Sequence, residues 1–131
     1  MEKHKTDFTL TFRNLCPLVI DNKESDFQKF RNHFSSSKDI NNWLSNWKSR
    51  LSFEKRNKDN IFTFIKDINP AYIPRNHRIE EMINKALEGD YSLFYLLNEI
   101  LSTPFNDQKK YQEYQVPPKE NQIVKQTFCG T

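Results

Sequence analysis

Three histidines are the side chains of this sequence best suited to acid–base or metal chemistry: His4, His33 and His77. A protein metal site needs several His, Cys or carboxylate ligands at characteristic short spacings. None of the three histidines forms a recognised metal-binding pattern with a residue three or four positions away. We therefore expect no metal-binding residue in this chain.

His77 stands three and four residues before the carboxylates Glu80 and Glu81. Carboxylates stabilise the N-terminus of a helix, and we favour this structural interpretation over a role for His77 as a general base. Neighbouring side chains on a helix point about 100° apart, so Glu80 and Glu81 do not converge on one substrate atom. The sequence predicts no catalytic residue.

Glycine is scarce, since Gly89 and Gly130 are the only two in 131 residues. Loops that cradle phosphate groups need several glycines, because the backbone must approach the ligand closely. Neither a Walker loop nor a GxGxxG loop can be built from this sequence. We expect no cofactor-binding residue and no nucleotide site of the usual kinds.

Two cysteines, Cys16 and Cys129, are too few for a disulfide scaffold or a cysteine-based zinc site. Cys16 follows Leu15 in a predicted helix, so we expect it in the core. Cys129 stands third from the end, in a segment without helical pattern. An accessible thiol there is open to redox chemistry, and an incidental residue is the alternative.

Five basic residues surround the end of one predicted helix and suit contacts to phosphate or RNA: Lys48, Arg50, Lys55, Arg56 and Lys58. Acidic neighbours lie among them, and cations near a helix C-terminus also stabilise the helix. The net charge of +3 is too small to argue for nucleic acid by itself. We favour this structural interpretation over nucleic-acid binding, which stays a third, weaker hypothesis.

Apolar residues recur at helical spacing in six segments, near residues 8–15, 25–34, 40–51, 61–68, 75–87 and 93–101. The clearest face consists of Ile40, Trp43, Leu44, Trp47 and Leu51. Eleven Phe, five Tyr and two Trp supply much of the apolar area for a core. The sequence predicts an all-α, bundle-like domain of five or six helices.

Helix ends are also predicted from the sequence. Thr6 and Asp90 are expected to cap the helices that follow them, and Ser25 with Gln28 is expected to form a capping box. Gly89 is placed for a left-handed turn between two antiparallel helices. After Pro104 the pattern fades, so we expect a helical domain over 1–104 and an extended tail over 105–131.

The segment 69–76 contains two prolines and presents Arg75 and Asn76 at the start of a helix. Arg75 can brace this turn, which we favour, or bind a carboxylate or carbonyl ligand.

No apolar run approaches the length of a membrane span. The polar N-terminus leads into no signal-peptide core, so we expect a cytoplasmic protein without a membrane partner.

Seven segments carry a more specific pattern: 7–15 (DFTLTFRNL), 43–51 (WLSNWKSRL), 69–76 (NPAYIPRN), 86–90 (ALEGD), 103–106 (TPFN), 114–118 and the final Cys-Gly-Thr. In this order and spacing they resemble the C-terminal region of the selenoprotein O family, protein adenylyltransferases with a kinase-like, or pseudokinase, fold. Each motif alone is weak, and their succession over nearly the whole chain is specific.

The resemblance implies that full-length relatives transfer AMP from ATP to protein hydroxyl groups with Mg²⁺ or Mn²⁺. Their catalytic residues lie in a kinase-like core upstream of the matched region, so the resemblance assigns none to this chain, and we expect the chain alone to be inactive. The implied partners are that core and the family's protein substrates.

Cys129 matches a terminal position that holds selenocysteine in eukaryotic relatives. In bacterial relatives a cysteine there can form a regulatory disulfide with the core, which implies a redox role for Cys129. Gly130 and Thr131 depart from the usual pair of serines.

The alternative function is a free-standing helical protein-interaction module without enzymatic activity.

Overall fold

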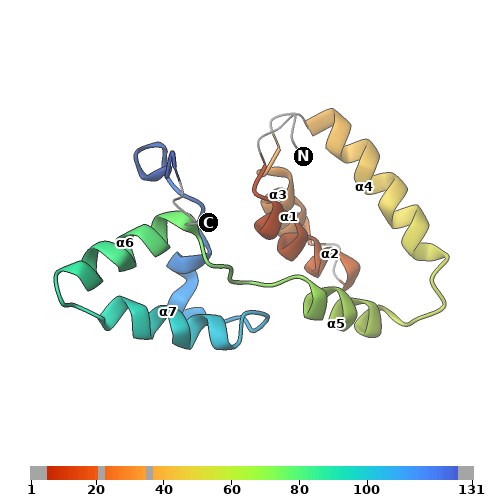
Figure 1. Ribbon diagram of the computed structural model, residues 1–131. Helices are drawn as coiled ribbons and strands as arrows, with labels where there is room; N and C mark the ends of the chain where they lie inside the picture. The colour runs from red at the N-terminus through yellow and green to blue at the C-terminus, as the bar shows by residue number, and fades with distance from the viewer. Residues whose placement is uncertain (1–5, 21–22, 35–36, 127–131) are drawn as a thin grey trace. The chain divides into compact units, whose positions relative to one another are not determined.

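The computed structural model describes residues 6–20, 23–34 and 37–126, and in these ranges the chain is helical without a strand (Figure 1). The α-helices are α1 (Phe8–Leu15), α2 (Pro17–Ile20), α3 (Glu24–Arg31), α4 (Ser37–Ser52), α5 (Lys58–Ile68), α6 (Asn76–Leu87) and α7 (Ser92–Ser102). Two 3₁₀-helices follow, η2 (Lys109–Gln115) and η3 (Glu120–Gln122). The all-α prediction is confirmed, and the helix beyond the expected six is the four-residue α2, which begins at Pro17.

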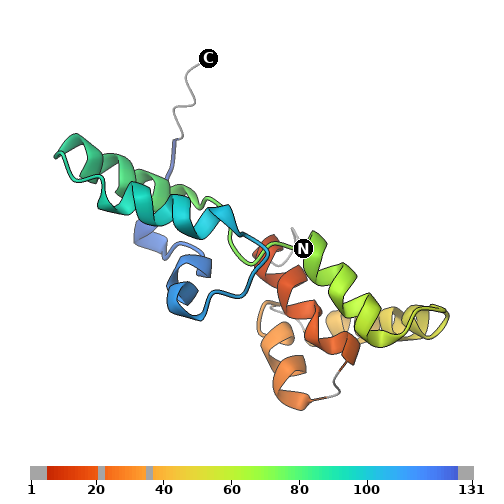
Figure 2. The ribbon, with the colours of Figure 1, turned by 90° about the horizontal axis from the view of Figure 1, so that it is seen from below.

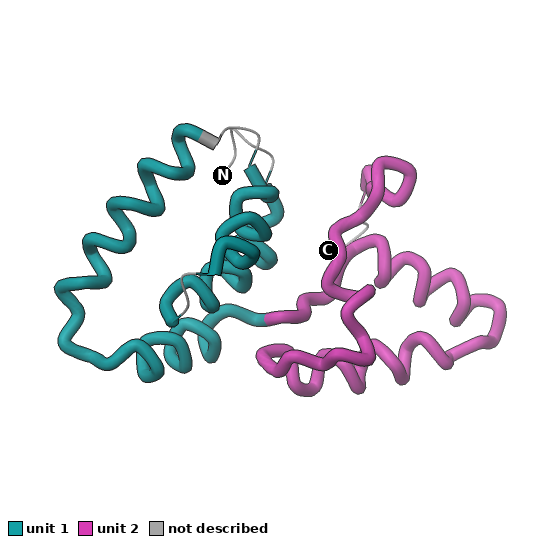
Figure 3. Tube along the Cα trace, turned by 180° about the vertical axis from the view of Figure 1, so that it is seen from behind, with its two compact units in different colours: residues 1–70 teal, residues 71–131 magenta. Residues whose placement is uncertain are grey.

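The chain divides into two compact units, residues 1–70 and residues 71–131 (Figure 3). The division falls within the proline-rich turn that the sequence predicts. The expected boundary between a helical domain over 1–104 and a tail over 105–131 stays a prediction. None of the helices in the described ranges has the length and apolar character needed to cross a membrane.

The core of the first unit forms where α1 and α2 meet α3 and α4. Its buried members are Leu15, Leu18, Phe27, Phe30, Ile40 and Leu44. Phe12, Phe34 and Trp47 pack against this cluster from partly exposed positions. The predicted face of α4 is therefore only half confirmed, because Ile40 and Leu44 are buried whereas Trp43 is 43% exposed.

Two predicted helix caps differ in the structure. Asp7, and not Thr6, caps α1, since its carboxylate accepts a 2.8 Å hydrogen bond from the Leu10 amide. A carboxylate at this position is as effective a cap as a hydroxyl. The Ser25–Gln28 capping box is wrong, because α3 begins at Glu24, and Lys23, two residues before Ser25, stands at its cap without a side-chain hydrogen bond.

Arg13 joins α1 to the end of α5. Its side chain is buried, and Nη1 donates hydrogen bonds to the carbonyl oxygens of Lys66 at 3.1 Å and Asn69 at 2.9 Å. These carbonyls belong to the C-terminal end of α5, where oxygens lack helical partners and the helix dipole favours a cation. Arg13 thus donates hydrogen bonds to carbonyl oxygens at the end of α5, where Pro70 has no amide hydrogen to donate.

In the second unit, α6 and α7 run in opposite directions from a short turn (Figures 1 and 2). Gly89 has φ of +87°, as the predicted left-handed turn requires. Asp90 accepts a 2.9 Å hydrogen bond from the Ser92 amide at the start of α7. The predicted helical hairpin is confirmed, and Leu93, Leu97 and Ile100 are its buried residues on α7.

Residues after Pro104 contain regular structure that the helical period does not reveal. Tyr111 and Tyr114 lie on η2, with an edge-to-face ring contact at 6.3 Å between centroids. Their spacing of three matches a 3₁₀-helix, which has three residues per turn. Tyr111 is buried with Ala71, Tyr72 and Ile100 in the second core.

Replacing Arg13 by methionine tests the link between α1 and α5. Both carbonyl oxygens would lose a charged donor, so we expect the free energy of unfolding to fall by about 1–3 kcal/mol. Urea unfolding followed by circular dichroism measures this change. The matched control is Arg50→Met, which removes an exposed ion pair with Glu54 and should change stability by about 0.5 kcal/mol or less. Equal effects of the two variants would contradict the assigned role.

Candidate functional site

The start of the second unit is held by one carbonyl group. The Pro104 oxygen accepts hydrogen bonds from the amides of Ala71 at 2.8 Å and Tyr72 at 3.1 Å. The Tyr72 ring is buried, and its hydroxyl donates to the Gln108 oxygen at 2.6 Å. The side-chain amide of Gln108 donates to the Ile100 carbonyl oxygen at 2.8 Å. The turn segment is therefore fixed against the end of α7.

Arg75 and His77 line a cavity of about 300 Å³ at the start of α6. Ile73, Pro74 and Asn76 complete one wall, and residues 118 and 122–124 form the other. Arg75 is buried, and its carbonyl oxygen begins α6 by accepting from the Arg78 and Ile79 amides. This position agrees with the interpretation that Arg75 braces the turn, while ligand contact by Arg75 stays a hypothesis.

His77 is also buried at this cavity. Burial lowers the pKa of His77 below its ordinary value of 6.5, and the neighbouring cations Arg78 and Arg75 lower it further. The imidazole is therefore predominantly neutral at pH 7. Glu81 raises the pKa of His77, but this effect is smaller than those of burial and the two arginines, and its carboxylate pairs with Arg78 at 2.9 Å.

The expected stabilisation of a helix N-terminus by Glu80 and Glu81 is wrong, because α6 begins at Asn76 and its first turn contains no acidic residue. Glu80 and Glu81 are both exposed, as the solvated-face interpretation requires. Arg78 bridges α6 to η2, with its guanidinium 4.8 Å from the centre of the Tyr114 ring. In the described ranges no group of three His, Cys, Asp or Glu side chains is placed to hold a metal ion.

Three of the five basic residues near the end of α4 contact neighbouring side chains. Lys48 places its ammonium 3.9 Å from the centre of the Phe27 ring, and Arg50 pairs with Glu54 at 2.8 Å. Arg56 lies 5.3 Å from the Phe64 ring. Cation–π contacts of this kind stabilise the fold, and they account for several of these charges without a nucleic-acid ligand.

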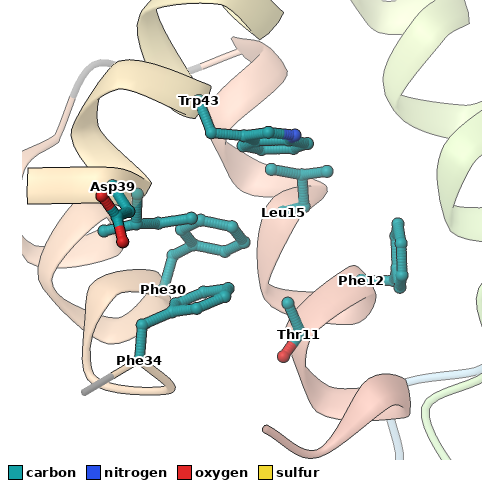
Figure 4. A pocket seen from close by; sticks show the side chains of 8 residues that line it. Thr11, Phe12, Leu15, Phe30, Phe34, Asp39 and Trp43 are labelled. Carbon is teal, nitrogen blue, oxygen red and sulfur yellow. The ribbon is translucent and has the colours of Figure 1, made fainter. Parts of the chain in front are cut away.

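An apolar groove of about 280 Å³ opens in the first unit between α1, α3 and α4 (Figure 4). Its lining consists of Thr11, Phe12, Leu15, Phe30, Phe34, Asp39, Ile40 and Trp43. Six of these eight side chains are aromatic or aliphatic. Helical periodicity places Trp43 on an apolar helix face but does not predict this groove, because it does not show which part of a face stays uncovered.

The two cysteines differ in what the structure describes. Cys16 is 2% exposed, and its thiol lies 3.5 Å from the Phe12 carbonyl oxygen, so its predicted place in the core is confirmed. Cys129 lies outside the described residues, as does His4. The predicted redox role of Cys129 stays a prediction.

The protein is of a helical class with two small units. Its described residues do not bring a set of catalytic side chains together. A family model described as protein adenylyltransferase SelO matches residues 1–102. The chain therefore belongs to the SelO family, and the resemblance found from the sequence motifs is confirmed.

Curated relatives match along the whole chain. The protein nucleotidyltransferase YdiU of Nitrobacter winogradskyi is 41% identical over 131 residues, and that of Rhizobium etli is 42% identical over 132 residues. The relative from Ruegeria pomeroyi is 39% identical. The chain spans about a quarter of the length of these relatives, 26% of the first two and 25% of the third.

The burial of His77 predicts a pH dependence of stability. Because its pKa is lowered in the folded state, the unfolded chain takes up the proton first as the pH falls. The stabilisation is complete above the unfolded pKa of about 6.5 and is lost as the pH falls below it toward the folded pKa. We expect His77→Gln to reduce the loss of stability between neutral and mildly acidic pH.

His33→Gln is a parallel variant, because burial also lowers the pKa of His33. We expect each variant to remove part of the pH dependence of stability. Nuclear magnetic resonance titration of both imidazoles measures the pKa values directly. A pKa for His77 at or above its ordinary value would contradict this description of the site.

Proposed function

We propose that this chain forms the C-terminal, non-catalytic helical part of a SelO family protein adenylyltransferase. The observation that carries the proposal is the match of the entire chain to about a quarter of each relative. The remaining three-quarters would contain the kinase-like core. A cytoplasmic setting, where ATP is abundant, is part of this proposal.

In this proposal the core transfers AMP from ATP to hydroxyl groups of protein substrates, forming a phosphodiester and releasing pyrophosphate. ATP and Mg²⁺ or Mn²⁺ would bind to the core. The described residues of this chain do not fit a metal site, since they contain no suitable ligand cluster. We therefore derive no catalytic step from them, and the role of this part is to complete the fold of the enzyme.

Uncovered helix faces support this role. The apolar face of α5 includes Phe64 and Ile68, which are 52% and 58% exposed. The corresponding face of α6 includes Ile83 and Leu87, which are 48% and 82% exposed. Single exposed apolar residues are ordinary, but helices with one apolar face normally bury it. These faces are suited to packing against another part of the protein.

The same faces suit the alternative function, a free-standing helical module that binds a protein partner. The two functions differ in what the chain stabilises. A part of the enzyme stabilises the kinase-like core, whereas an independent module folds cooperatively alone and has no effect on that core.

A chimera separates these possibilities. The matched quarter of the Nitrobacter winogradskyi relative is replaced by this chain, and the relative without that quarter is the control. We expect the chimera to unfold at a higher temperature than the truncated relative and to label protein with AMP from radioactive ATP, while the isolated chain labels nothing. A chimera no more stable and no more active than the truncated relative would refute the proposal.

Cys129 is proposed to regulate the enzyme by forming a disulfide with a cysteine of the core. The two thiols would lose two protons and two electrons to an oxidant such as oxidised glutathione. In the chimera, oxidation should change AMP transfer reversibly, and Cys129→Ser should abolish that change. Cys16→Ser is the control, because a buried thiol should not contribute. Equal redox sensitivity of the chimera with and without Cys129 would exclude the role.

A further inference from the structure

The groove of the first unit has a rigid apolar interior. Leu15, Phe30 and Ile40 are 5%, 1% and 7% exposed and form its buried part. Phe34 packs on Phe30 with 5.3 Å between ring centroids, and the Trp43 ring is stacked on Phe30 at 6.1 Å. Contacts among these rings fix the shape of the groove before anything binds, and a preformed site loses little conformational entropy on binding.

Trp43 forms the open edge of the groove. Figure 4 shows its indole lying over the space between Phe30 and α1. The indole also contacts Trp47, whose ring lies within 10° of parallel to it at 6.1 Å between centroids. A 43% exposed indole held in this way offers a large apolar area at low entropic cost. Tryptophans of this kind are enriched at the centres of protein interfaces.

The groove offers few polar groups to a ligand. Thr11 and Asp39 are its two polar lining residues. The Thr11 hydroxyl donates to the Asp7 carbonyl oxygen at 2.6 Å, so its proton is already used. Sites for metabolites combine several converging polar groups and usually enclose about 300–1,000 Å³. A groove of about 280 Å³ with this lining fits one or two large apolar side chains instead.

We propose that this groove receives a large apolar side chain from the remaining three-quarters of the SelO family polypeptide. This inference rests on the proposed function, in which that part is joined to the chain. The occupant follows from length: the chain matches only 26% of a relative, so most of the polypeptide that folds with it lies outside the matched part. An apolar face of a helix laid against such a groove is a common mode of recognition.

Photo-crosslinking in the chimera tests the inference. Trp43 is replaced by p-benzoylphenylalanine, which bonds to nearby C–H groups on illumination, and the crosslinked peptides are identified by mass spectrometry. We expect crosslinks from position 43 to peptides of the relative's own part, within one molecule. Phe53 is the matched control, since its ring is 75% exposed and does not line the groove; its crosslinking yield should be several-fold lower.

A second measurement does not depend on the crosslinker. Trp43→Ala should lower the unfolding temperature of the chimera more than that of the isolated chain, because in the chimera it also removes contacts to the occupant. Phe53→Ala should lower both to a similar, small extent. Circular dichroism at low temperature establishes that each variant retains its helices.

The outcomes are distinct. A stable, active chimera without crosslinks from position 43, or with crosslinks only between two copies, overturns the groove's assignment and leaves the proposed function standing. A chimera that fails to fold or to transfer AMP overturns the proposed function and the inference with it. Intramolecular crosslinks together with the larger effect of Trp43→Ala support both.

Discussion

The amount of apolar helix face that two small units can bury is the constraint on which this structure depends. Units of this size cover only about 60% of the surface that their unfolded chains expose. The first core buries Phe30 completely and the second buries Tyr72 and Ile100. The apolar faces of α5 and α6, by contrast, include residues that these cores leave exposed to solvent. The chain therefore has apolar area that its own cores do not bury, and this area is the basis of its proposed place in a larger protein.

Polar contacts at helix ends and turns stabilise these small cores. Arg13 satisfies carbonyl oxygens at the end of α5, and the Pro104 oxygen accepts both amides at the start of the second unit. Each contact joins segments that are distant in sequence. A buried backbone group without a partner costs about 1–3 kcal/mol, so these contacts stabilise the end of α5 and the start of the second unit.

Most of the helices, and the family, can be predicted from the sequence. Proline fixes φ and cannot continue a helix, and glycine permits a left-handed turn. The helix ends near Pro17, Pro70, Gly89 and Pro104 are therefore predicted reliably. Caps are less certain, because Thr6 and Asp7 are both good candidates and only the local geometry selects Asp7. The 3₁₀-helix around Tyr111 escapes a search for the α-helical period.

The candidate sites were harder to predict. Periodicity identifies Trp43 and Leu87 as members of apolar faces, but it cannot show whether the chain itself covers them, since that depends on packing between distant segments. The cavity at Arg75 and His77 likewise includes Pro118 and residues 122–124, which are far along the chain. The role of Cys129 depends on a partner that the resemblance places outside the matched region, so no local pattern can test it.

Hydrogen exchange in α5 and α6 tests the central claim most directly, comparing the isolated chain with the chimera. If the exposed faces of these helices pack against the rest of the enzyme, local opening becomes rarer, and their amides exchange more slowly in the chimera. Exchange at the same rate in both proteins, with the chimera folded, would contradict the claim that this chain completes the fold of a larger enzyme.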